Sequence, residues 1–113
     1  MSNSAEQTEA RFAAIAKTLV RKDGVTLGAQ GKKGFGSAAL QVNGKIFAMV
    51  SSRGAFVVKL PKDRVEALEN TGAGRKFDPG HGRLMKEWLE LDPAYSEDWL
   101  ALAKEALQFV AGR

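Results

Sequence analysis

Residues 37–52 read SAALQVNGKIFAMVSS, and this stretch predicts a β-hairpin. Asn43-Gly44 at its centre is typical of a two-residue type I′ turn, because both central residues of that turn need positive φ. Such a turn sets the pairing of the two strands. The expected partners are Val42 with Lys45, Leu40 with Phe47, and Ala38 with Met49.

This register gives the hairpin two apolar faces. The first, with Leu40, Val42, Phe47 and Met49, is expected to meet helices. The second face should meet water, and its apolar members are Ala39, Ile46, Ala48 and Val50. A contiguous exposed apolar strip suggests a partner. Three outcomes are open: a homodimer or another protein bound through Ile46, Ala48 and Val50, or coverage of the strip by a loop at 24–36.

Helical and strand patterns flank the hairpin. Residues 5–22 carry an apolar stripe at helical spacing, Pro61 suits the first turn of a helix over 61–70, and a third helix is expected over 96–111. Residues 55–60 are rich in β-branched and aromatic side chains and predict a strand. Residues 83–91 fit a helix or a strand, because periodicity alone does not decide at this length.

Composition predicts one domain over 1–113, with residues 1–5 as a disordered tail. The chain has no cysteine, which excludes disulfides and thiolate metal sites. No apolar run approaches the roughly 20 residues of a membrane span, and the N-terminus lacks the basic and apolar regions of a signal peptide. We therefore expect a soluble, cytoplasmic protein that does not bind membranes.

Charge is distributed unevenly along the chain. Residues 1–59 hold nine Lys/Arg and three Asp/Glu, a formal charge of +6, whereas residues 60–113 carry −2. No acid lies between Asp23 and Asp63, so residues 24–62 form a basic block. Such a block is either an ordinary solvated surface or a site for nucleic acid. The candidate nucleic-acid contacts are Lys32, Lys33, Lys45 and Arg53.

The glycine-rich stretch GAQGKKGFGS, at 28–37, resembles a phosphate-binding loop only superficially. It has neither the spacing nor the hydroxyl of a P-loop, and it leads from a helix into a strand. The simpler interpretation is a flexible entry to the sheet. Lys32 and Lys33 could still contact nucleic-acid phosphates without a defined pocket.

A second candidate site is FDPGHGR, at 77–83, which contains the single histidine. Pro79-Gly80 indicates a turn, and a role in ligand contact for His81 and Arg83 stays open. One histidine and one aspartate are too few for a metal site, and no second group is positioned for acid–base work. We therefore expect no catalytic residue, no metal and no cofactor.

Three stretches carry a resemblance: NGKIFAM and VVKLP, followed by GRLMKEWL before a tryptophan-bearing C-terminal helix. In this order they resemble the TfoX N-terminal-like and MmcQ/YjbR-like small bacterial domains over roughly residues 10–111. The resemblance implies a two-layer α+β domain of order α-β-β-β-α-β-β-α, with both terminal helices on one face of an antiparallel sheet. It also implies a strand over 83–91 and a short strand near 75–77. Trp88 in the longer strand is expected to point toward the helices and to belong to the core.

The resemblance says less about function. The MmcQ/YjbR group is often labelled DNA-binding, and no catalytic residues carry over onto this sequence. We expect a non-enzymatic binding module, with nucleic acid as the first partner to test. The alternatives are a protein-interaction or self-associating domain, or a small-ligand-binding domain that uses the 77–83 loop.

Overall fold

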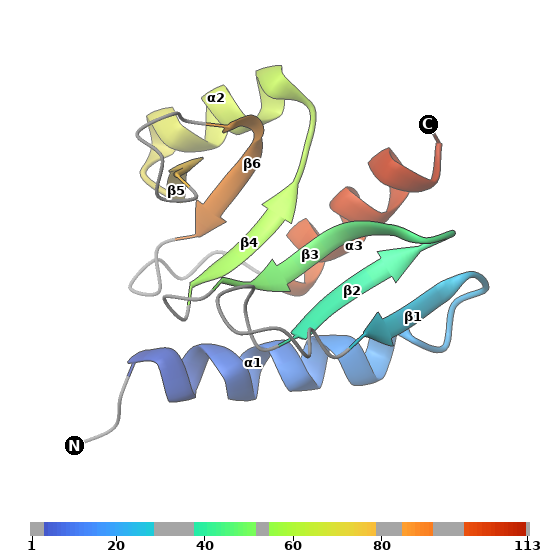
Figure 1. Cartoon of the computed structure of the whole chain (residues 1–113). Helices are drawn as coiled ribbons and strands as arrows, with labels where there is room; N and C mark the ends of the chain where they lie inside the picture. Colours follow the sequence, from blue (N-terminus) through green and yellow to red (C-terminus); the bar gives the residue numbers. More distant parts are fainter. Residues whose placement is uncertain (1–3, 29–37, 52–54, 79–84, 92–98, 113) are drawn as a thin grey trace.

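The computed structural model describes residues 4–28, 38–51, 55–78, 85–91 and 99–112. Three helices and six strands follow one another along the described chain in the order α-β-β-β-β-α-β-β-α (Figure 1). In chain order they are α1 Ser4–Leu19, β1 Val25–Gly28, β2 Ala38–Val42, β3 Lys45–Val50, β4 Phe56–Lys59, α2 Lys62–Thr71, β5 Gly74–Phe77, β6 Met85–Leu91 and α3 Trp99–Ala111.

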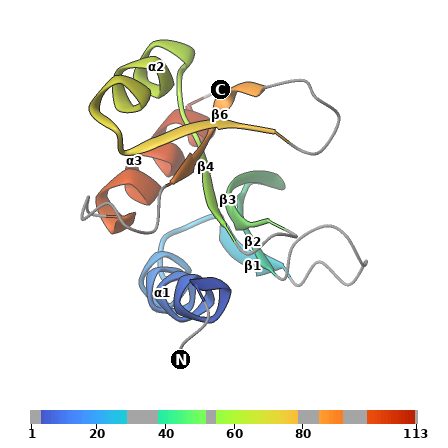
Figure 2. The ribbon, with the colours of Figure 1, turned by 90° about the vertical axis from the view of Figure 1, so that its left-hand side faces the viewer.

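The strands form one antiparallel sheet in the order β1-β2-β3-β4-β6-β5. The helices lie on one side of this sheet (Figure 2), where α1 and α3 pack on the central strands and α2 packs on β5 and β6. The predicted two-layer α+β class, with both terminal helices on one face, is confirmed. No helix in the described ranges is long and apolar enough to cross a membrane.

One hydrophobic core fills the space between the helices and the sheet. The apolar stripes of α1 and α3 meet the inward side chains of the strands, because these positions recur at the period of each element. The largest fully buried side chains of the core are Phe47, Phe56, Leu19, Leu40, Leu60, Leu89 and Leu91. Three aromatic rings join within it: Phe12 meets Phe56 edge-on at 5.9 Å, and Phe56 stacks on Trp99 at 5.0 Å between ring centroids.

The central turn forms as predicted, but the hairpin register beyond it differs. Asn43 and Gly44 have φ of 52° and 83°, and Val42 pairs with Lys45. A bulge then shifts the pairing, so Leu40 faces Ala48 rather than Phe47. The same shift pairs Ala39 with Met49, and Ala38 with Val50.

The bulge reverses the side-chain alternation of β3, since one extra residue moves every later side chain to the other face. Phe47, Ala48 and Val50 are all fully buried in the core, whereas Met49 is half-exposed on the outer face. The expectations that Met49 points to the helices and that Ala48 and Val50 lie on the outer face are therefore wrong. Self-association or protein binding stays a prediction, and Ala48 and Val50 offer no surface for it.

The strand β1 is a feature that the sequence analysis did not predict. Val25–Gly28 pairs with β2 along its whole length, from Val25 with Val42 to Gly28 with Ala39. The expectation had placed these residues in a loop that enters the sheet. A segment of four residues carries too little periodicity to stand out, and its backbone partners are supplied by β2.

The C-terminal half of the sheet agrees with the resemblance. Both β5 and β6 are strands, and they pair with each other. Leu89 and Leu91 of β6 are buried in the core, so Trp88, which precedes Leu89, and Glu90, which lies between the two leucines, take the outer face. The expectation that Trp88 points toward the helices is wrong for this reason.

The helix ends differ from the expected ones by a few residues. The first helix begins at Ser4, inside the expected tail of 1–5, and ends at Leu19 instead of residue 22. The second follows Pro61 and ends at Thr71, and the next residue, Gly72, has a φ of 85°, the left-handed conformation typical of a glycine cap. The expected start of the third helix, at 96, lies outside the described residues.

Candidate functional site

A hollow of about 550 Å³ opens where the strands β3 and β4 separate. The last pair between them is Ala48 with Val58. The residues of β3 before Ala48 therefore do not pair with β4, whereas the end of β4 stays paired with β6. Figure 1 shows the two strands splaying apart at this point. The hollow is lined by Gly44, Lys45, Ile46, Lys59, Trp88 and Val110.

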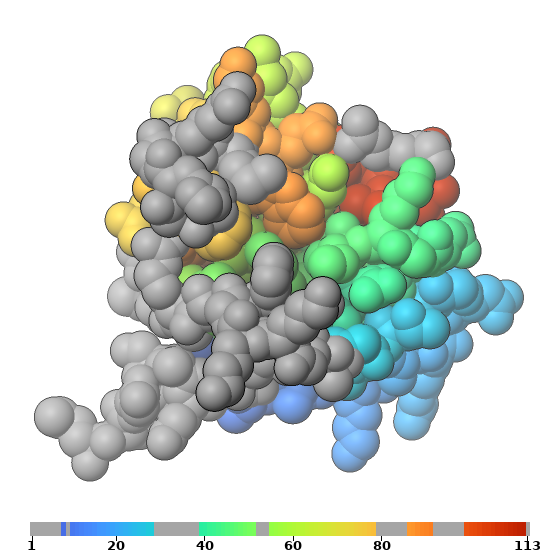
Figure 3. All heavy atoms as spheres, viewed as in Figure 1, coloured from blue at the N-terminus to red at the C-terminus, as the bar shows by residue number. Residues whose placement is uncertain are grey.

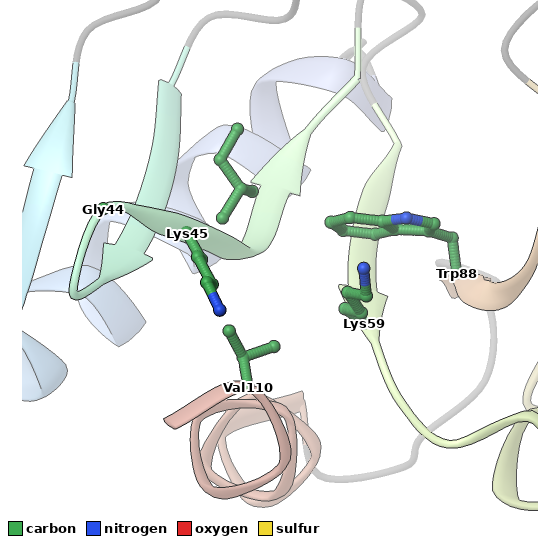
Figure 4. A pocket seen from close by; sticks show the side chains of 6 residues that line it. Gly44, Lys45, Lys59, Trp88 and Val110 are labelled. Atoms are coloured by element: carbon green, nitrogen blue, oxygen red, sulfur yellow. The ribbon is translucent and has the colours of Figure 1, made fainter. Parts of the chain in front are cut away.

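The floor of the hollow is the end of α3. Val110 is buried at its base, and in the space-filling view α3 (red) is visible between the spheres of β6 (orange) and of β3 (green) (Figure 3). Close by, the side chain of Lys45 points toward Val110 from the start of β3 (Figure 4). An apolar base with charged side chains at its rim is the usual composition of a ligand site.

Trp88 and Lys59 form the opposite wall. They are direct partners in the pairing of β6 with β4, so their side chains share the outer face of the sheet. The Lys59 Nζ lies 5.3 Å from the centroid of the Trp88 ring (Figure 4), within the range of a cation–π interaction. This contact orients the lysine amine and the indole at the mouth of the hollow.

The charge of the hollow is of one sign. Its lining contains Lys45 and Lys59 and, among the described residues, no acidic side chain. Lys45 is exposed, whereas Lys59 and Trp88 are each half-buried. Two amines and an aromatic ring around one concave surface suit a planar, anionic ligand, because the ring offers stacking and the amines offer charge.

The residues proposed from sequence are distributed as follows. Lys45 lines the hollow. The remaining candidate nucleic-acid contacts (Lys32, Lys33 and Arg53) and the candidate ligand contacts His81 and Arg83 lie outside the described residues. In the described part of the chain, no three His, Cys, Asp or Glu side chains gather in a way that could hold a metal ion.

Two residues of the hollow were missed in the sequence. Trp88 was assigned to the core because large aromatics usually pack there. Lys59 was counted within the basic block but not as a contact. The alternation in MKEWLEL is the signal that could have found Trp88, since a strand that buries Leu89 and Leu91 turns Trp88 outward.

Comparisons of the chain with family models, curated proteins and solved structures give no match. The resemblance to the TfoX and MmcQ/YjbR domains thus stays a prediction. The class defined by fold and surface together is an α+β domain with a basic, tryptophan-lined hollow at the split end of its sheet.

Proposed function

We propose that this chain is a non-enzymatic binding module whose ligand is nucleic acid. The observation that carries the proposal is that Lys45 and Lys59, from two different strands, line one hollow with Trp88. Lysines that neutralise phosphates release condensed counterions, which supplies most of the affinity of a basic surface for nucleic acid. The uninterrupted basic block at 24–62, to which both lysines belong, supports the same ligand.

The test is binding of a fluorescent oligonucleotide over a range of salt concentrations. For the wild type, the logarithm of the binding constant should fall linearly with the logarithm of the salt concentration. Replacement of both Lys45 and Lys59 by Ala should weaken binding and make the slope shallower by about 1.4, because each phosphate contact on a single strand contributes about 0.7.

A matched control removes the same charge elsewhere. Lys17 on α1 and Lys104 on α3 are exposed, and neither lines the hollow. The double variant Lys17→Ala, Lys104→Ala should therefore bind with nearly the wild-type salt slope. Equal losses in the two double variants would show that binding follows net charge alone, and binding that ignores salt would reject the proposal.

A further inference from the structure

We infer that Trp88 is a stacking platform for an unpaired base, so that the hollow takes single-stranded rather than double-stranded nucleic acid. This inference rests on the proposed function and specifies its ligand. It starts from an exposed feature of the outer sheet face: the indole of Trp88 is only half-buried, although Trp99, the second tryptophan, is 2% exposed.

The ring is held in place from one side. Lys59 Nζ lies over it at 5.3 Å from the centroid, and Lys59 is fixed beside Trp88 by the strand pairing. An indole has two faces, and the amine takes one of them. A base stacks on an aromatic face without regard to its identity, since every base presents a π-surface.

The amines are placed for a backbone next to that base. Lys45 and Lys59 line the same hollow as Trp88, from opposite sides of the split between β3 and β4. A single strand can turn a base onto the ring and leave its phosphates near the amines. A duplex keeps its bases stacked on each other, and unstacking one costs free energy that a single strand does not spend.

The experiment compares a strand of about 12 thymidines, within the range of site sizes for single-strand binders, with a duplex of the same length at low salt. The wild type should bind the single strand more tightly. Trp88→Leu should weaken that binding by about 5-fold to 150-fold, the range for the loss of one base–aromatic stack. Its salt slope should stay at the wild-type value, because Lys45 and Lys59 remain.

Trp88→Phe is the matched variant, because it keeps an aromatic face and removes the indole. It should bind far better than Trp88→Leu. Tryptophan fluorescence gives an independent readout: the thymidine strand should quench the wild type, and this quenching should disappear in Trp88→Phe, where only the buried Trp99 emits. This readout decides the question even if Trp88→Leu does not fold.

Each outcome separates the two proposals. Equal affinity for duplex and single strand, or quenching that persists in Trp88→Phe, would overturn the stacking inference and leave phosphate binding by the lysines intact. Absence of salt-dependent binding to either oligonucleotide would overturn both. A salt slope that falls in Trp88→Leu as far as in the double lysine variant would show that Trp88 only positions Lys59, and would also overturn the inference.

Discussion

Glu69 of α2 and Lys76 of β5 are joined by two hydrogen bonds. The Lys76 Nζ donates to Oε1 of Glu69 at 2.6 Å, and the backbone N–H of Lys76 donates to Oε2 at 3.2 Å. These hydrogen bonds link α2 to β5, the edge strand of the sheet. These bonds from Lys76 hold the pKa of Glu69 below its usual 4.5, and the bond to Glu69 raises the pKa of Lys76 above its usual 10.5.

The Glu69 carboxylate should therefore make stability depend on pH on the acid side. A lowered folded-state pKa means that its contribution is complete above pH 4.5 and is lost as the pH falls through the folded value. Glu69→Gln should lower the melting temperature at pH 7, and the difference from wild type should shrink below pH 4.5. Thermal melts over pH 2–8 would measure this.

Glu66→Gln is the control for that series. It removes the same charge from the same helix, and Glu66 acts on Lys76 only through its longer-range charge. At pH 7 it should lower the melting temperature less than Glu69→Gln does.

Lys76 should affect stability only on the basic side. Because its pKa is raised in the folded protein, the contribution of the Lys76 amine to stability persists up to pH 10.5 and is lost only above that, so the basic arm of the stability profile should be flat through neutrality.

Gly74 and Gly72 should respond differently to alanine. A Cβ on Gly74 would collide with the backbone carbonyl of Glu90 in the paired strand β6. A Cβ on Gly72 would meet nothing within 4 Å and would only strain the left-handed φ of 85°. Gly74→Ala should cost about 2–3 kcal/mol and Gly72→Ala about 1 kcal/mol in urea unfolding. A larger loss of stability in Gly72→Ala than in Gly74→Ala would contradict the described pairing of β5 with β6.

The bulge in β3 makes a prediction for two adjacent residues. Val50 is 1% exposed and belongs to the core, whereas Met49 is half-exposed on the outer face. Val50→Gln should cost about 2 kcal/mol or more because it buries an amide, and Met49→Gln, which changes length little, should cost less than about 1 kcal/mol. If Met49→Gln cost more stability than Val50→Gln, the result would support the unbulged register instead.

Arg11 contributes to the junction of the two terminal helices. Its Cζ lies 3.4 Å from the centroid of the Trp99 ring, which stacks on Phe56 beneath the sheet. Arg11→Gln should cost about 0.5–2 kcal/mol through loss of this cation–π contact, and Arg11→Lys should retain part of it. Arg21→Gln, an exposed cation after the same helix, should be nearly neutral, and equal losses at both positions would exclude a specific contact.

The local elements could be predicted because their signals are local. Asn43-Gly44 predicts the hairpin turn because a type I′ turn needs positive φ at both central residues, and Asn and Gly adopt it readily. Pro61 and Gly72 mark the two ends of α2 by their own backbone preferences. The apolar stripes of α1 and α3 identify helices and their buried faces without knowledge of the rest. The strand at β6 was expected only from a resemblance, since its periodicity was ambiguous.

Only tertiary packing decided which side chains reach the surface. The bulge near Leu40 depends on how the hairpin fits against the helices, and it alone moves Ala48 and Val50 inward and Met49 outward. β1 is a strand because β2 offers it an edge. Lys45, Lys59 and Trp88 lie 14 or more positions apart in the sequence, and their hollow exists because β3 and β4 stop pairing at Ala48 and Val58. No local pattern encodes where two strands part, because that point is set by the twist of the whole sheet over its helices.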